Sequence, residues 1–231
     1  MSRATQFRLT RFAILGFVVC LAAAMLTYAG GTRADPQAKG YSFLHSPLSA
    51  LGVTVVASGK SNAVSSRLFT VGETLAGTGL LLFFGALLPL YAELPGARLW
   101  LARGGCLAGM LAGIGSVVVG WLPVNLHPVV HGVAAQWTFR ALLVASILCG
   151  MAAAGKPAFS TRTVRGWFAF ALLLAAFIVV GILAPPGTIR VVVQKLIVLS
   201  SVVIVTFESY EAERMLPTAR SGSVAGRLTS A

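Results

Sequence analysis

The sequence predicts an all-α membrane protein, a bundle of six transmembrane helices with both termini in the cytoplasm. Three observations predict it. The 231 residues are 57% hydrophobic and only 10% charged, with a mean hydropathy of +0.86, whereas a soluble domain carries about 25% charged residues. Six apolar segments are long enough to cross about 30 Å of hydrocarbon. Most basic residues lie in the connections and tails outside these segments.

Proline or glycine marks most ends of the expected spans. Residues 1–11 form a basic N-terminal segment, residues 12–211 one membrane domain, and residues 212–231 a polar, disordered tail. The first span follows three arginines like a signal peptide, but its apolar run exceeds the usual length of about 7–15 residues, so we expect it to be retained rather than cleaved. The expected spans are about 12–29, 69–90, 99–122, 129–153, 164–184 and 189–210.

The connection 30–68 is the longest between spans, and it contains a short apolar segment, Leu48–Ala57. This segment is too short to cross a membrane. It predicts a re-entrant or interfacial segment, or a short strand, because Val53, Val55 and Val56 are β-branched, as is Thr54 between them.

The distribution of basic residues sets the orientation. Eleven Lys and Arg residues lie in the N-terminus, the second and fourth connections and the C-terminal tail, against five on the other side, four of them in the long loop. Short basic segments stay in the cytoplasm, which predicts a multi-pass protein of the cell (inner or plasma) membrane. The formal net charge of +12 therefore indicates contact with membrane lipids and not with nucleic acid.

Polar residues within and beside the spans are the functional candidates, because an ionisable side chain at the centre of a span costs about 2.5–3.5 kcal/mol to insert. The predicted orientation places all three histidines and most of the polar residues of the spans toward the outer side. We therefore expect an outer-leaflet pocket formed by His45, Glu73, His127, His131, Gln136, Arg140, Gln194 and Lys195.

Arg140 is the deepest cation of this set. It can pair with Glu73, and it can also hold an anion or a lipid headgroup, because a guanidinium binds phosphate and carboxylate with two hydrogen bonds. Lys195 can extend its amine to the outer interface. The expected ligand-binding residues are Ser49, Gln136, Arg140, Gln194 and Lys195.

His127 and His131 have the i, i+4 spacing of metal ligands on a helix. No glutamate lies between them and Pro128 interrupts the turn, so no metal or other cofactor is expected. The alternatives are zinc held by His45, His127 and His131, or by the last two with Glu73, and haem ligated by His45 and His131.

Gly105, Gly109 and Gly113 lie four residues apart within the third span. Such a series lets a second helix approach closely. We expect this face to pack within the chain; a homodimer through the same three glycines is the alternative.

Two segments resemble motifs of the DUF998 family of bacterial and archaeal membrane proteins. Residues Gly40–Gly52 resemble its G-Y-x-x-x-x-H-x-x-S-x-L-G stretch, and Gly120–Asn125 with His131 resembles its G-x-x-P-x-[DN] … H segment. Gln194-Lys195 resembles the Gln-Arg of its last helix. The resemblance covers about residues 41–199 and places on motif positions His45, Ser49, Gly52, Pro123, His131 and Lys195.

The DUF998 family is similar to the six-helix Frag1, DRAM and Sfk1 membrane proteins, which are linked to lipid handling, so the resemblance implies this architecture. The chain departs from the pattern at Ala50, where the family often has an acid, and at Asn125, where Asp is common. An activity that depends on those acids would be lost here.

The leading functional hypothesis is a non-enzymatic membrane protein that binds a lipid headgroup or small anion in the outer pocket, as a scaffold, regulator or transport component. The alternative is an enzyme, a metal-assisted lipid hydrolase or acyl-remodelling protein with His45, His131 and Glu73 as catalytic residues. A proton- or redox-coupled transporter is a third hypothesis, and the absence of a detectable repeat argues against it.

Overall fold

The computed structural model describes residues 1–32, 35–154, 156–157 and 159–216. Over these residues the protein is all-helical, which confirms the predicted fold class, and six helices are long and apolar enough to cross a membrane. Two short 3-10 helices accompany them. The elements are α1 (Arg3–Thr27), η1 (Leu48–Gly52), α2 (Ala63–Leu87), η2 (Leu88–Tyr91), α3 (Gly96–Trp121), α4 (Pro128–Ala153), α5 (Thr161–Leu183) and α6 (Thr188–Arg214).

Several helices are longer than their apolar cores predict. α1 begins at Arg3, where the Ser2 hydroxyl accepts a hydrogen bond from the Thr5 amide at 3.1 Å and caps the helix. The basic segment 1–11 is therefore mostly the first turns of α1. α6 continues to Arg214, so the start of the expected tail is helical. Residues 217–231 of that tail lie outside the described residues.

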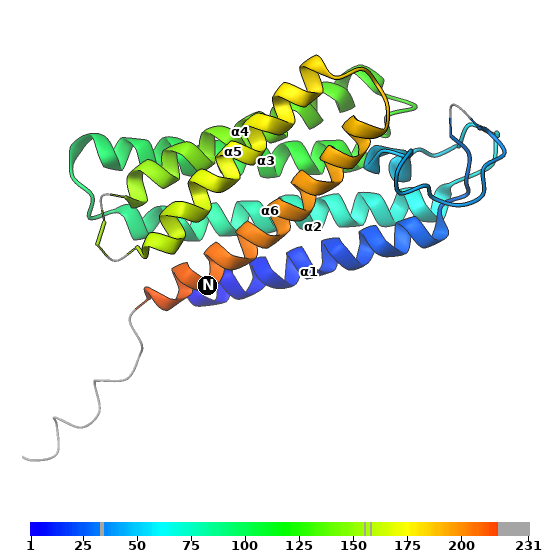
Figure 1. Cartoon of the computed structure of the whole chain (residues 1–231). Coiled ribbons are helices and arrows are strands. Elements are labelled where there is room, and N and C mark those ends of the chain that lie inside the picture. Colours follow the sequence, from blue (N-terminus) through cyan, green and yellow to red (C-terminus); the bar gives the residue numbers. More distant parts are fainter. Residues whose placement is uncertain (33–34, 155, 158, 217–231) are drawn as a thin grey trace, which may run out of the picture.

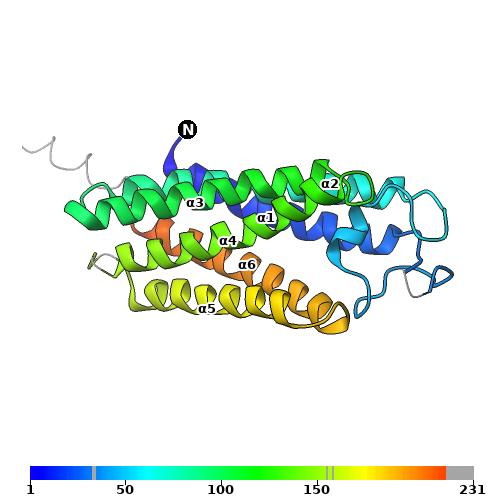
Figure 2. The ribbon, with the colours of Figure 1, turned by 90° about the horizontal axis from the view of Figure 1, so that it is seen from above.

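The helices form a closed bundle in which each packs against its neighbours in sequence and α6 returns to α1. α5 lies beside α4 and α6 and on the opposite side of the bundle from α3 (Figure 2). α6 runs obliquely across the bundle. Its C-terminal end lies beside the N-terminal end of α1, and the two helices diverge toward the long loop (Figure 1). This divergence positions the site described below.

The centre of the bundle is filled by aromatic rings and by glycines that bring helices together. Phe83, Phe84 and Trp167 form a ring cluster with centroids 5.0–6.2 Å apart. A Cβ atom at Gly109 would collide with the Phe84 ring, and one at Gly113 would lie 2.7 Å from a carbonyl oxygen of α2.

The glycine face of α3 is thus covered by α2 and α4 of the same chain, as expected. Gly105 faces Cys149 of α4. The homodimer through Gly105, Gly109 and Gly113 stays a prediction, and it would have to displace these contacts.

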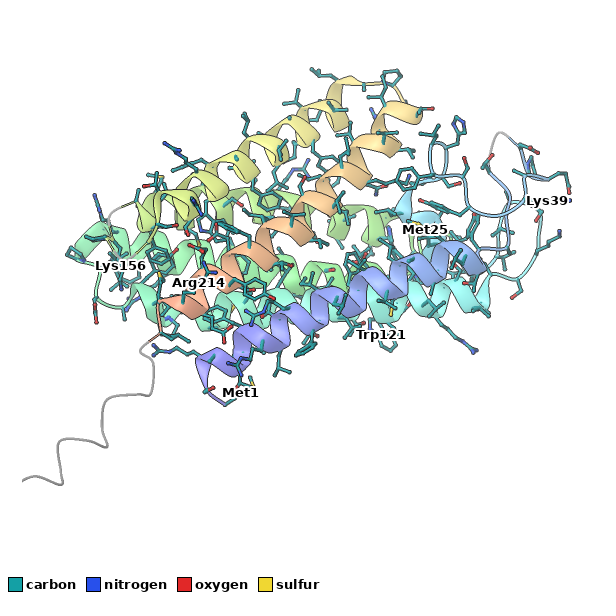
Figure 3. The ribbon with its side chains drawn as sticks, turned by 60° about the horizontal axis from the view of Figure 1, so that its bottom comes forward. Met1, Met25, Lys39, Trp121, Lys156 and Arg214 are labelled. Carbon is teal, nitrogen blue, oxygen red and sulfur yellow. The ribbon has the colours of Figure 1, made fainter. Side chains whose placement is uncertain are left out.

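The two ends of the bundle differ in composition (Figure 3). Met1, Lys156 and Arg214 mark the end that holds the chain's first residues and the basic connections. Met25, Lys39 and Trp121 mark the other end, which is covered by the long connection between α1 and α2.

The apolar segment of the long loop is neither a strand nor a re-entrant helix. Leu48–Gly52 forms η1, and an isolated antiparallel bridge joins Val55 to Ser61. Asn62 explains this conformation, because its amide donates to the carbonyl oxygens of Leu51 (3.1 Å) and Val53 (2.9 Å). A buried side chain thus supplies the hydrogen bonds that a partner strand would otherwise give.

Candidate functional site

A cavity of about 370 Å³ lies inside the bundle near its loop end. Residues from α1, α2, α3, α4 and α6 line it, and η1 contributes Leu48 and Ser49. α5 contributes no residue to its wall. The wall is mainly apolar, and its larger apolar side chains include Ile14, Phe17, Phe69, Leu80 and Phe139.

The polar part of the wall contains most of the ligand-binding residues that the sequence predicts. Among the lining residues, Glu73 and His131 are the ionisable ones, and Lys and Arg are absent. Five predicted residues lie in the wall: Ser49, Glu73, His131, Gln136 and Gln194.

Glu73 is fixed by the close approach of α2 and α3. The Ser116 hydroxyl donates to Glu73 Oε2 at 2.6 Å. Gly120 permits this approach, because a Cβ atom there would lie 2.7 Å from Glu73 Cβ. The Thr70 hydroxyl also donates to the Gly120 carbonyl oxygen at 2.8 Å. The carboxyl group is therefore held at one position of the cavity wall.

His131 lies in the first turns of α4 and is only 3% exposed. Its Nδ1 lies 2.8 Å from the Leu122 carbonyl oxygen. Because a carbonyl oxygen can only accept, this contact places the proton on Nδ1, and in the neutral ring Nε2 is then an acceptor.

Gln194 and Lys195 attach the long loop to α6. Gln194 Oε1 accepts a hydrogen bond from the Leu48 amide at 3.1 Å, at the end of the cavity. The Lys195 amine donates to the Ser46 carbonyl oxygen at 2.8 Å, as does the Tyr41 hydroxyl at 2.7 Å.

Lys195 contacts protein groups and does not line the cavity. Its amine lies 5.5 Å and 5.0 Å from the ring centroids of Tyr41 and Phe43, and the residue is 6% exposed and outside the cavity wall. Burial and the neighbouring Tyr28 raise the pKa of Tyr41, so this phenol stays protonated as a donor. The cation therefore holds the loop instead of facing a ligand.

Arg140 does not pair with Glu73, so that expectation is wrong. Its guanidinium donates to Gln136 Oε1 at 3.1 Å and lies 5.6 Å from the Trp137 ring centroid. Both partners are on its own helix, one turn earlier. The arginine is thus neutralised by no acid among the described residues and does not line the cavity.

The two remaining histidines also lie away from the cavity. His45 and His127 are exposed, and His45 Nδ1 is 3.3 Å from the Thr188 hydroxyl. Of the eight residues expected in one pocket, four line the cavity, Glu73, His131, Gln136 and Gln194, and the other four do not.

Three hydroxyl residues in the wall were not expected from the sequence: Ser116, Thr138 and Ser201. Ser and Thr are common in membrane spans and carry no charge, so they give little signal. Ser116 is the one with a recognisable signal in the sequence, because it continues the small-residue face of α3 after Gly113, and that face packs on α2.

Within the described part of the chain, no three His, Cys, Asp or Glu side chains lie close enough together to hold an ion. The three catalytic candidates of the enzyme hypothesis are likewise split, because Glu73 and His131 share the cavity while His45 lies on the exposed loop.

The fold and the six apolar helices define a multi-pass membrane protein. No family model, no curated protein and no solved structure matches the chain. The resemblance to the DUF998 family therefore stays a prediction. One of its motif positions has a clear structural role: Asn125 accepts from the Thr54 amide at 3.2 Å and donates to the Thr54 hydroxyl at 2.9 Å, joining two loops.

Proposed function

We propose that this membrane protein binds a lipid-like molecule in the cavity between α4 and α6. The observation that supports the proposal is the cavity itself. Its volume of about 370 Å³ lies in the range of ligand pockets, roughly 300–1,000 Å³, and a mainly apolar wall with a few fixed polar groups is typical of such pockets. Apolar lining favours an alkyl or isoprenoid chain over a polar solute.

The orientation predicted from the basic residues is part of this proposal. With both termini in the cytoplasm of a cell-membrane protein, α2, α4 and α6 begin on the outer side. Glu73 then lies about 15 Å along α2 and Gln136 about 12 Å along α4, at 1.5 Å per residue. Both polar side chains then lie in the outer half of the membrane, as expected for the headgroup of a ligand taken from the outer leaflet.

The side of the cavity near Gln136 supports entry from the lipid. Gln136 lines the cavity and is nevertheless an exposed residue, so its side chain lies where the wall meets the surface. The neighbouring Trp137 and Val133 are also exposed on α4. A ligand crossing here passes from lipid to the cavity without entering water.

The structure gives the small-anion form of the hypothesis no support. Both cations expected to bind the anion, Arg140 and Lys195, lie outside the wall, and the lining residues include a glutamate. A bound lipid is compatible with a role as a scaffold, a regulator or a transport component. No observation favours the enzyme hypothesis over these roles.

A cavity-filling substitution tests the proposal. In Ala135→Phe a ring from α4 fills the cavity, so we expect at least a several-fold loss of lipid retained by the purified protein in detergent, measured by native mass spectrometry. Ala176→Phe, on an exposed position of α5 outside the wall, is the matched control. Equal lipid content in the wild type and both variants, with equal thermal stability, would contradict the proposal.

A further inference from the structure

We infer that the ligand is an amphiphile whose headgroup is a protonated amine, received by the Glu73 carboxylate inside the cavity. The inference rests on the proposed function and deepens it by naming the headgroup. It excludes fatty acids and phosphate-bearing lipids as the preferred ligands.

The surroundings of Glu73 carry the first step. Among the described residues, no Lys, Arg or His forms an ion pair with it, and its protein hydrogen bond comes from Ser116. A carboxylate within a bundle costs several kcal/mol unless it is paired or hydrogen-bonded. A cationic headgroup supplies the missing partner, whereas an anionic one adds repulsion.

The hydroxyl groups of the wall point to the same chemistry. Ser116 donates to Glu73, Thr138 donates to the Ala134 carbonyl oxygen at 2.8 Å, and Ser201 donates to the Ile197 carbonyl oxygen at 2.8 Å. The hydrogens of these three hydroxyl groups are therefore used within the protein, and what remains on their oxygens is acceptor capacity.

The same holds for His131, whose Nδ1 proton is directed to Leu122 and whose Nε2 is left as an acceptor. An ammonium group has three donors and no acceptor, so it matches these acceptors. Donors remain toward the loop end of the cavity, in the Ser49 hydroxyl and in the amide NH2 groups of Gln136 and Gln194. They suit an oxygen atom carried on the ligand beside its amine.

Three probes with one chain and different headgroups test the inference: oleylamine, oleyl alcohol and oleic acid. Binding to the full-length protein in nanodiscs is measured by displacement of a fluorescent fatty amine. For the wild type we expect oleylamine to bind about ten-fold more tightly than the alcohol, and the acid most weakly, as for a partly desolvated charge pair. Equal or tighter binding of oleic acid would overturn the inference.

Variants of Glu73 separate charge from shape. Glu73→Gln should remove the amine preference, and Glu73→Asp, which keeps the charge, should retain most of it. Glu93→Gln, with a side chain that is 90% exposed and outside the cavity, is the control and should bind all three probes like the wild type. If Glu73→Gln and Glu73→Asp lose the amine preference equally, or if both keep it, the inference that the charge of Glu73 recognises the amine is wrong.

The Ala135→Phe variant distinguishes the two failures. If it abolishes binding of all probes while the wild type shows no amine preference, the lipid-binding proposal stands and the headgroup assignment fails. If Ala135→Phe binds every probe like the wild type, the cavity is not the binding site and both fail.

Discussion

The two ends of α6 are held by different interactions. At its C-terminal end, Glu213 accepts hydrogen bonds from Arg8 at 2.9 Å and Arg11 at 2.5 Å of α1, and the Arg11 guanidinium lies 4.0 Å from the Tyr210 ring centroid. At its N-terminal end, the helix contacts the loop 41–52, and the hydrogen bonds of Gln194 and Lys195 there are to backbone groups.

This difference explains where the cavity lies. Ion pairs between α1 and α6 bring the helices together at one end and leave no space for a ligand. At the other end the two helices diverge toward the long loop (Figure 1), and Leu48 and Ser49 of η1 line the cavity there. The charged end fixes the position of α6, and the loop end leaves room for binding.

The largest expected effect comes from breaking the charged end. Arg11→Ala removes the less exposed of the two arginines, with a side chain 15% exposed, and leaves Glu213 with one exposed partner. We expect the free energy of unfolding to fall by about 2 kcal/mol, because a half-buried carboxylate loses its main ion pair. Thermal or denaturant unfolding in detergent measures it; an unchanged midpoint would show that the pair does not hold the two helices.

A smaller effect is expected at the loop end. Lys195→Met keeps the volume of the side chain but removes the donor to Ser46, so the loop 41–52 should open more often while the bundle stays folded. We expect faster hydrogen exchange of the loop amides by about ten-fold, and a loss in global stability of at most about 1 kcal/mol. Unchanged exchange in this loop would mean that Lys195 does not hold it.

The smallest effect is expected for Arg8→Ala, which is the matched partner of the first substitution. Arg8 bonds the same glutamate but its side chain is 66% exposed. An exposed ion pair contributes about 0–1 kcal/mol, so the unfolding midpoint should move much less than in Arg11→Ala. A loss as large as that of Arg11→Ala would mean that exposure does not decide the strength of these pairs.

The fold class and the approximate places of the spans followed from the sequence, because length and hydropathy are properties of continuous segments. The ends were less well predicted. α1 extends to Arg3, where Ser2 caps it, and α6 extends to Arg214, next to the ion pairs of Glu213 with α1. Ion pairs between distant segments leave no mark on local hydropathy.

The candidate site was predicted in part, for a geometric reason. Topology fixes how far each residue lies along its helix, and it placed Glu73, Gln136 and Gln194 in the same end of the bundle, where all three line the cavity. It does not fix the direction of a side chain. Arg140 is one turn from Gln136, yet its guanidinium turns back to Gln136 and Trp137 and does not enter the cavity.

The glycine contacts between α2 and α3 have a mechanical consequence. With Gly77 against Gly113 and Gly120 against Glu73, these two helices are in close contact at several positions. Close-packed contacts resist displacement, so we expect α2 and α3 to move together and to carry Glu73 with them. Because α1, α4 and α6 also line the cavity, we expect any widening to come from those three helices, and the ion pairs of Glu213 to limit the movement of α6 to its N-terminal end.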